Sequence, residues 1–262
     1  MQREFDGKVA VITGGSRGIG QGIASALAAE GARTVLVASS EDNLRVAARA
    51  IAHSGAPAPD TCAADLRRPD ACERVAQHVH ERHGRCDILV NSAGATRAGA
   101  FQKLDEEAWQ DGFGLKFFGC VRLCRLLWPL LELAKGHVVN VIGGAARTPD
   151  PEFLIGGAVN AAMWNFSKGL AALGKRGGVN VNAILPGITE TDRVQQLLQQ
   201  RAEASGTTME AVRAATLAKD GIARIGRPED VAALAVFLCS ERARHIQGTA
   251  IAVDGGATPG LY

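Results

Sequence analysis

The stretch Val9-Ala10-Val11-Ile12-Thr13-Gly14-Gly15-Ser16-Arg17-Gly18-Ile19-Gly20 decides the fold of this chain. Its first residues are apolar and predict a buried strand, and the alanine-rich run that follows has the spacing of an amphipathic helix. The glycines between them, Gly14, Gly18 and Gly20, allow a sharp turn and a close approach of the backbone to a ligand. Because the turn opens a helix, it directs the helix N-terminus at a bound phosphate. The alternative is a tight strand-to-helix turn that binds nothing.

The segment from Thr13 to Gly20 resembles the cofactor motif of the short-chain dehydrogenases/reductases, in particular the branch of the β-ketoacyl carrier-protein reductases. The resemblance runs from about Phe5 to Gly256 and ends in Val253-Asp254-Gly255-Gly256, which is similar to the C-terminal strand of that family. It implies an oxidoreductase that uses a nicotinamide dinucleotide, acts on a small molecule and assembles as a homo-tetramer or dimer.

Composition excludes several other classes of protein. The net charge of +2 gives no reason to expect binding to nucleic acid or to an acidic membrane surface. We expect no membrane-spanning segment and no signal peptide, because no long apolar run occurs and the first residues are polar. The six cysteines form no Cys-x-x-Cys pair, which is typical of reduced thiols in a cytoplasmic protein. Neither they nor the nearby His78, His80 and His83 complete a metal site, so no metal is expected.

Strand and helix patterns alternate to the end of the chain, with no linker and no internal repeat. This order predicts an α/β fold, a Rossmann-type doubly wound parallel sheet of about seven strands with helices on both faces, in one domain spanning residues 1–262. A polar, helical segment at 191–220 is inserted between core elements, and we interpret it as a lid over the substrate. The predicted strands are 9–12, 34–38, 61–64, 86–90, 137–142, 179–184 and 250–253, and the predicted helices include 41–53, 69–83, 106–134, 153–175 and one that begins at Arg227-Pro228.

The residues after the second predicted strand indicate which dinucleotide binds. NAD-type sites have an acid there, which bonds the ribose hydroxyls and would repel a 2′-phosphate. This chain has Ser39 and Ser40 instead, and Arg17 lies beside the same pocket. Hydroxyls with a guanidinium suit a phosphate, so the pattern predicts NADP over NAD; otherwise Arg17 is a solvated surface arginine. The other cofactor-binding residues that the resemblance implies are Gly14, Ser16, Gly18, Ile19, Gly20, Asp65, Leu66, Asn91, Ala93, Gly94, Asn160, Pro186, Gly187, Ile188 and Thr191.

The catalytic positions of the family are altered here. The family uses a tyrosine, a lysine four residues later, a serine and an asparagine. This chain has one tyrosine, Tyr262, so no Tyr-x-x-x-Lys occurs in it. The resemblance places Gly156 at the tyrosine and Asn160 at the lysine, with Gly143 at the serine and Lys116 at the asparagine.

Lysine and asparagine have thus exchanged helices, and we expect the side chains of Lys116 and Asn160 to meet across the pocket. Asn160 would then bond the nicotinamide ribose. Lys116, partly desolvated, would have a lowered pKa and donate the substrate proton; alternatively, it only supports the pocket wall. The glycines at 143 and 156 would enlarge the pocket, and Arg193 is among the polar side chains near it.

Three functions remain open at this level. The first is an NADP-dependent reductase of a carbonyl or imine-like compound with an atypical catalytic centre. The second is a non-catalytic nucleotide-binding sensor or the inactive partner subunit of a mixed oligomer. The third is a lyase or isomerase that keeps the nucleotide for structure. Fold alone does not choose among them.

Overall fold

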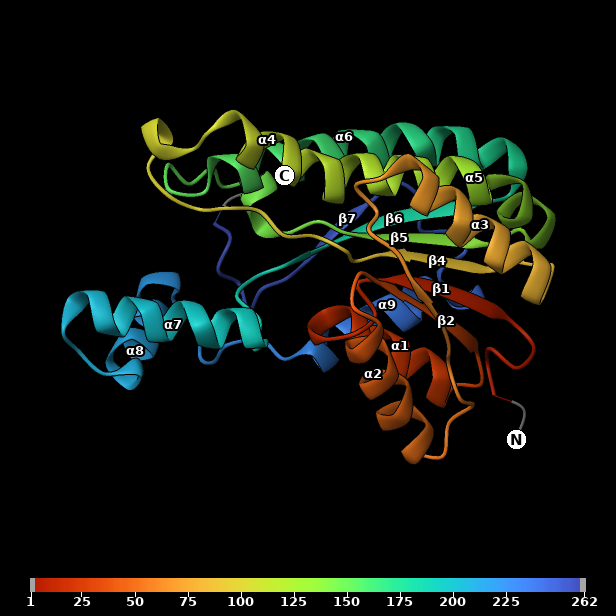
Figure 1. Ribbon diagram of the computed structural model, residues 1–262, viewed down its shortest axis with the longest axis horizontal. Coiled ribbons are helices and arrows are strands. Elements are labelled where there is room, and N and C mark those ends of the chain that lie inside the picture. Colours follow the sequence, from red (N-terminus) through yellow and green to blue (C-terminus); the bar gives the residue numbers. More distant parts are fainter. Residues whose placement is uncertain (1–2, 260–262) are drawn as a thin grey trace.

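The computed structural model describes residues 3–259. Within these residues, seven strands form one parallel sheet in the order β3-β2-β1-β4-β5-β6-β7 (Figure 1). The predicted fold class is therefore confirmed. Tyr262 lies outside the described residues. The strands are β1 (Val9–Thr13), β2 (Arg33–Ala38), β3 (Asp60–Ala63), β4 (Ile88–Asn91), β5 (His137–Val141), β6 (Asn180–Pro186) and β7 (Ala250–Val253).

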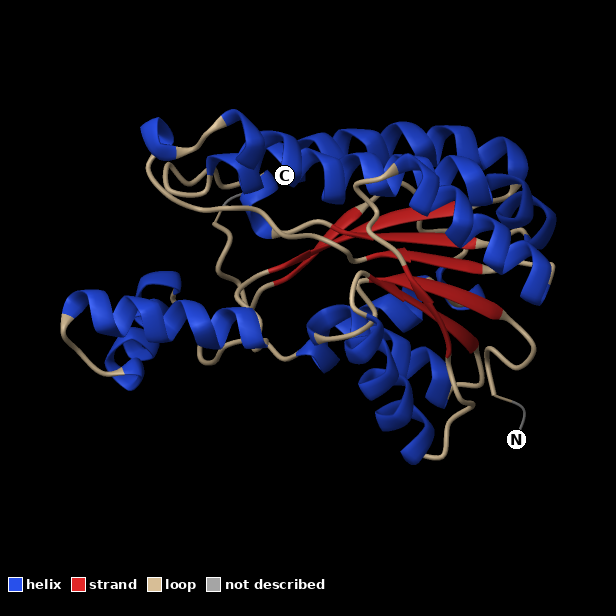
Figure 2. Ribbon diagram, in the orientation of Figure 1, coloured by secondary structure: helices blue, strands red, loops and turns tan. Residues whose placement is uncertain are grey.

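Helices cover both faces of the sheet (Figure 2). One face packs against α1 (Gly18–Ala29), α2 (Glu41–His53) and α9 (Pro228–Leu238), and the other against α3 (Pro69–His83), α5 (Gly119–Ala134) and α6 (Leu154–Gly177). Every residue of β1 is buried, as central strands covered on both faces require. The remaining short elements are α4 (Glu106–Gly112) and the 3₁₀ turns Phe101–Lys103, Gly144–Ala146 and Glu241–Ala243.

Local capping explains why the helices α2 and α3 begin and end where the sequence predicted. Ser40 precedes α2, and its hydroxyl accepts a hydrogen bond from the Asn43 N–H at 3.2 Å, which satisfies one of the unpaired N–H groups of the first turn. Pro69 occupies the first turn of α3, where its missing N–H costs nothing. Gly84 ends that helix at φ +62°, a left-handed conformation that glycine adopts without strain.

The prediction of a single helix over 106–134 is wrong in one respect. A π-helical turn, Phe113–Phe118, separates α4 from α5. Glycines stand at both of its ends: a Cβ on Gly112 would be 2.7 Å from the Ile155 Cγ2 of α6, and one on Gly119 would be 3.1 Å from the Leu66 Cβ. These glycines permit close packing within the chain, and the π turn adds one residue to a helical turn without any marker in the sequence.

The polar segment 191–220 forms two helices, α7 (Asp192–Ser205) and α8 (Met209–Asp220), which project from the body of the molecule (Figure 1). Thr191 and Thr208 cap them through side-chain oxygens that accept from the N–H groups of Val194 and Ala211. An ion pair between Arg213 and Glu190 ties α8 back to the loop after β6. None of the helices in residues 3–259 combines the length and the apolar character that a membrane span requires.

Candidate functional site

The order of the strands reverses between β1 and β4, and in such sheets ligands bind at the carboxyl ends of the strands beside that point. Thr13, at the end of β1, pairs in register with Asn91 at the end of β4. The Thr13 hydroxyl accepts hydrogen bonds from the N–H groups of Ser92 and Ala93, both at 3.0 Å. Thr13 therefore joins the glycine loop to the loop after β4, a role that we did not predict. Its place directly before Gly14 is the signal that could have revealed it.

The glycine loop leaves the start of α1 open. Gly14 and Gly18 have φ of +65° and +55°, and a Cβ on Gly20 would overlap the Gly14 carbonyl. Arg17 precedes the helix without capping it through its side chain, and no acidic residue lies in the first turn. The unpaired N–H groups of that turn are therefore suited to an anion. Ser16 and Ile19 belong to the same turn and are partly buried, so the loop fits the pyrophosphate of a dinucleotide.

The predicted adenosine end lies along the carboxyl ends of β2 and β3. Ser39 is exposed there, as a group that contacts a phosphate requires. The Ser40 oxygen is occupied as the cap of α2. Asp65 accepts from the Arg67 guanidinium at 3.0 Å, and Leu66 is buried with 3% of its surface exposed. Of these four, Ser39 has the side chain that is free to meet a ligand.

The predicted nicotinamide end joins the loops after β4 and β6. A Cβ on Gly187 would be 2.7 Å from the Asp254 Cβ, and one on Gly18 would be 3.0 Å from the Thr191 methyl. Thr191 thus lies against the glycine loop, whereas Gly187 lies against the end of β7; the contact of Pro186, Gly187, Ile188 and Thr191 with a nicotinamide stays a prediction. The Asn91 side chain is directed elsewhere, because its Nδ2 donates to the Asn140 Oδ1 at 2.9 Å inside the sheet. Its Oδ1 is buried without a hydrogen-bond partner in the described residues.

Lys116 and Asn160 meet, as the exchange of lysine and asparagine predicted. The Lys116 Nζ donates to the Asn160 Oδ1 at 2.7 Å and also to the Ile142 carbonyl, at the end of β5. The stem of Lys116 lies against the loop after β4, since a Cβ on Gly94 would be 2.9 Å from the Lys116 Cδ. The π turn therefore delivers the ammonium group to the carboxyl edge of the sheet, between β4 and β5.

The surroundings of Lys116 lower the pKa of its ammonium group. Burial, and then the positive charge of Arg193, lower the pKa of Lys116 from 10.5 to about 8, because both disfavour the charged amine. Its two acceptors are neutral oxygens, and an ammonium group has three donors. One N–H is therefore left to point at a ligand. A group of this kind is able to give up a proton near neutral pH.

The expectation that Gly143 and Gly156 enlarge the pocket is wrong. A Cβ on Gly143 would lie 3.0 Å from the Asn160 Nδ2, and Gly143 has φ of +119°, which strains any other residue. A Cβ on Gly156 would overlap the ring of Phe153. Asn160 and Phe153 thus occupy the volume that the two glycines would otherwise leave. Phe153 was not predicted as a site residue, and its position three residues before Gly156 is the signal that could have identified it.

A buried chain of amides holds the strands and α6 together below the site. Besides accepting from Asn91, the Asn140 side chain donates through Nδ2 to the Ser167 Oγ at 2.8 Å. Ser167 in turn donates to the Met163 carbonyl at 2.6 Å, within α6. Asn140 is fully buried, so these bonds replace water for groups that would be costly to leave unpaired. They fix the position of α6, and with it Asn160.

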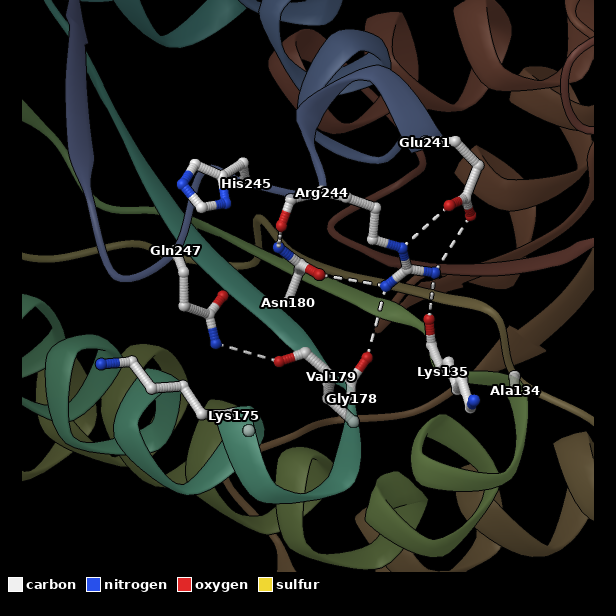
Figure 3. Close-up of a pocket in the computed structure, with 11 residues that line it drawn as sticks. Ala134, Lys135, Lys175, Gly178, Val179, Asn180, Glu241, Arg244, His245 and Gln247 are labelled. Carbon is white, nitrogen blue, oxygen red and sulfur yellow. Dashed lines mark hydrogen bonds and ion pairs between the residues drawn. The ribbon is translucent and has the colours of Figure 1, made fainter.

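A different cavity, of about 730 Å³, opens at the opposite end of the sheet, where β6 begins (Figure 3). Arg244 crosses it: its guanidinium bonds Glu241 at 2.9 Å, Asn180 at 3.0 Å and the Gly178 carbonyl at 3.3 Å. None of the predicted site residues lines this cavity. Because the donors of Arg244 are used within the protein, we interpret this cluster as a structural cross-link.

Metal and disulfide chemistry have no counterpart in the described structure. Within residues 3–259, no group of three or more His, Cys, Asp or Glu side chains is arranged to hold a metal ion. The six cysteines are free thiols. Cys120 and Cys124 share a face of α5, with sulfur atoms 3.9 Å apart, and the Cys120 thiol also lies near the Asn140 Oδ1. The two thiols are packed in the core rather than exposed to the crevice.

Comparison with known proteins agrees with this geometry. The model of the enoyl-(acyl carrier protein) reductase family matches residues 14–258. The 3-oxoacyl-(acyl-carrier-protein) reductase of Vibrio cholerae is 31% identical over 256 residues, 96% of this chain and 98% of that protein. The 2-(S)-hydroxypropyl-CoM dehydrogenase 3 of Xanthobacter autotrophicus is 34% identical over 260 residues, 98% of this chain and 99% of that protein.

Among solved structures, the L-sorbose reductase from Gluconobacter frateurii, complexed with NADPH and L-sorbose, superposes with a TM-score of 0.95 at 34% identity, covering all of both chains. The actinorhodin polyketide ketoreductase with NADPH superposes with a TM-score of 0.90 at 27% identity, over 95% of this chain and 97% of that one. The expected cofactor agrees with the NADPH in both structures. The family match includes the glycine loop and the helix that follows it, and the relatives are covered over almost their whole length. The chain belongs to the short-chain dehydrogenase/reductase family.

Proposed function

We propose that this protein is an NADP-dependent reductase of a small carbonyl or imine-like compound, in which Lys116 donates the proton. Family membership supports the reaction class, and the NADPH of the solved relatives supports the cofactor. The observation that carries the proposal is the position of the Lys116 Nζ, bonded to the Asn160 Oδ1 and the Ile142 carbonyl at the carboxyl edge of the sheet.

The residues at this edge fit NADPH. The uncapped N-terminus of α1 would take the pyrophosphate, and Ser39 with Arg17 would take the 2′-phosphate. The loop after β6, from Pro186 to Thr191, would border the nicotinamide. NADPH supplies a hydride when it is bound.

Lys116 completes the reduction. The carbonyl carbon gains the hydride, its oxygen gains a proton from the Lys116 ammonium, and the products are an alcohol, NADP⁺ and a neutral amine that recovers its proton from solvent. The Asn160 Oδ1 and the Ile142 carbonyl hold the Nζ through two of its N–H bonds, so the third is directed at the substrate oxygen. The Asn160 Nδ2 remains for the ribose hydroxyls. An iminium substrate would need the hydride alone, and its turnover would not depend on Lys116.

The test is NADPH oxidation by the purified protein with a panel of ketones, aldehydes and cyclic imines, in wild type and Lys116→Met. Loss of a general acid lowers kcat by about 10²–10⁴-fold. Lys116→Arg keeps the positive charge but cannot transfer a proton to the substrate near neutral pH, since arginine remains protonated. This variant therefore separates proton donation from charge. Lys168→Met is the matched control, because that lysine also donates to a backbone carbonyl, Gly248 at 2.8 Å, but on the exposed side of α6.

The dependence of kcat on pH gives a second readout. Lys116 must carry its proton, so carbonyl reduction should be fastest below a pKa of about 8 and decline as the pH rises through it. Lys116→Met should lose this decline. Carbonyl reduction at wild-type rates in Lys116→Met would remove Lys116 from the mechanism. Micromolar binding of NADPH with no turnover of any compound would favour a nucleotide sensor, and turnover independent of the redox state of the cofactor would favour a lyase or isomerase.

We further infer that α7 and α8 close over the substrate, and that the chain forms a homodimer or homo-tetramer. The outer faces of α5 and α6 support the second inference, because Phe118, Leu133 and Leu173 are 46%, 80% and 48% exposed there, and exposed apolar patches commonly mark interfaces. Leu133→Lys should lower the mass measured by light scattering if these faces form the interface. An unchanged mass would exclude them.

A further inference from the structure

Arg193 reaches across the mouth of the candidate site. It lies in the first turn of α7, and its Nη2 donates to the Thr96 carbonyl at 2.7 Å. Thr96 belongs to the same loop as Gly94, which Lys116 contacts. The guanidinium of Arg193 and the ammonium of Lys116 therefore approach one short loop, one from the segment after β6 and the other from the π turn.

The positive charges at this mouth are not balanced by the protein. In residues 3–259, neither Lys116 nor Arg193 nor Arg17 forms an ion pair. Of the two acids next to Arg193 in the chain, Glu190 is paired with Arg213, and Asp192, in the first turn of α7, is exposed to solvent. Arg17 and Arg193 are exposed to solvent, so their guanidinium N–H groups are accessible to a ligand of opposite charge.

Electrostatic repulsion acts between Arg17 and Arg193 and between Arg193 and Lys116. Partial removal from water, and then the charge of Arg17, lower the pKa of Arg193. Burial, and then the charge of Arg193, lower the pKa of Lys116. No carboxylate acts on either group in the opposite direction. Thr191 lies against Gly18, and Arg193, two residues further on, bonds the loop that Lys116 contacts at Gly94, so Arg193 lies between the glycine loop and Lys116.

The proposed function accounts for two of these cations. Arg17 meets a phosphate of the cofactor, and Lys116 meets the oxygen that is reduced. Arg193 lies between them and has one backbone acceptor. A guanidinium presents paired N–H groups that match the two oxygens of a carboxylate or phosphate.

We propose that the substrate is a carbonyl compound bearing an anionic group, a carboxylate or a phosphate, and that Arg193 binds that group while Lys116 binds the carbonyl oxygen. This inference rests on the proposed function and narrows it. It also separates this protein from the L-sorbose reductase it resembles, because L-sorbose carries no charge.

The experiment measures ligand binding to the NADP⁺-loaded protein by isothermal titration calorimetry, because NADPH would be consumed by any compound that is reduced. Two pairs of compounds differ in charge: 4-oxopentanoate with 4-oxopentanamide, and dihydroxyacetone phosphate with dihydroxyacetone. We expect each anion to bind about tenfold or more tightly than its neutral partner, and the stronger pair identifies carboxylate or phosphate as the group. Arg193→Leu should abolish the preference, and Arg193→Lys should retain part of it.

Two controls separate this role from others. Arg201→Leu, an exposed arginine on the same helix, should keep the preference for anions. The Kd of NADPH should be unchanged in Arg193→Leu, since the cofactor is assigned to Arg17. If that Kd rises while the preference for anions remains, Arg193 holds the cofactor and the inference is wrong.

The remaining outcomes either overturn the inference or support the anion site without the proposed reductase activity. Equal binding of both members of each pair, or no binding of any of the four compounds at millimolar concentration, would overturn it. Tight, Arg193-dependent binding of an anion that is never reduced would uphold the anion site, while the proposed reductase activity would fail.

Discussion

The ring of Phe153 occupies the space that any side chain at residue 156 would enter, because a Cβ built on Gly156 would overlap it. Phe153 immediately precedes α6, and Gly156 is buried in the first turn of that helix. An aromatic side chain without a hydroxyl thus fills this space, and it comes from three residues earlier in the chain.

We predict that Gly156→Ala lowers the free energy of unfolding by about 1–3 kcal/mol, the usual cost of adding a methyl group to a filled site. The double variant Phe153→Ala with Gly156→Ala should be less destabilised than the sum of the two single changes. Urea denaturation measures both quantities. Gly157→Ala is the matched control, because its Cβ would meet only the Ala145 carbonyl at 3.5 Å. Additive losses in the double variant would show that the two residues do not compete for space.

Ser39→Asp should weaken the binding of NADPH by about tenfold or more, since a carboxylate would repel the 2′-phosphate, and a factor of ten in Kd corresponds to only about 1.4 kcal/mol. NADH should bind as well as before or better. Isothermal titration with both cofactors measures the change. Ser54→Asp, at an exposed position after α2, controls for the added charge. Retained NADPH affinity would place the phosphate away from β2.

Stability should depend on pH through His137, at the start of β5. Burial, followed by the charge of Arg244, lowers the pKa of His137 from 6.5 to about 4. The unfolded chain therefore binds this proton more readily, and the free energy of unfolding should fall, by about 1–3 kcal/mol, as the pH drops from about 6.5 to about 4. His137→Gln should flatten the dependence in this window, and His80→Gln, on the exposed face of α3, should not. Chemical denaturation at several pH values tests this, and an unchanged slope in His137→Gln would contradict it.

Asn140→Leu should destabilise the protein more than its change in size explains. It would leave the Asn91 amide and the Ser167 hydroxyl without their buried partner, and each unpaired group costs about 1–3 kcal/mol. Asn91→Leu combined with Asn140→Leu should recover part of that loss, because the partner that would otherwise be left unpaired is also removed. A thermal unfolding series measures the coupling, and strictly additive effects would argue against a connected chain of amides.

The sequence was sufficient wherever one local signal decided the structure. Helices α2 and α3 begin and end as predicted because Ser40, Pro69 and Gly84 act on the turns next to them. The meeting of Lys116 and Asn160 was also predictable, because the two residue types had exchanged places on helices that this fold sets side by side. The cofactor positions after β4 and β6 came from the family resemblance and stay predictions.

The sequence was not sufficient where packing between distant elements decided. A glycine at 156 predicts space, but the backbone conformation at Phe153 turns its ring into that space. Ser40 was assigned to the cofactor, although its oxygen caps α2. The side chain of Asn91 was likewise assigned, although Asn140 holds it inside the sheet. In each case another residue of the chain fills the space or bonds the polar group that the prediction had left for a ligand.

The π turn at Phe113–Phe118 has a consequence for how relatives are aligned. A π turn holds one more residue than an α-helical turn, so the residues on either side of it are one position further apart in the sequence than in a regular helix. Counting forward from Trp109 and counting backward from Cys120 therefore agree only with relatives that contain the same turn. Deleting a single residue here would straighten the helix, keep both of its apolar faces and swing Lys116 out of the crevice. The place of the ammonium group at the carboxyl edge of the sheet thus depends on the π turn as well as on which amino acid stands at position 116.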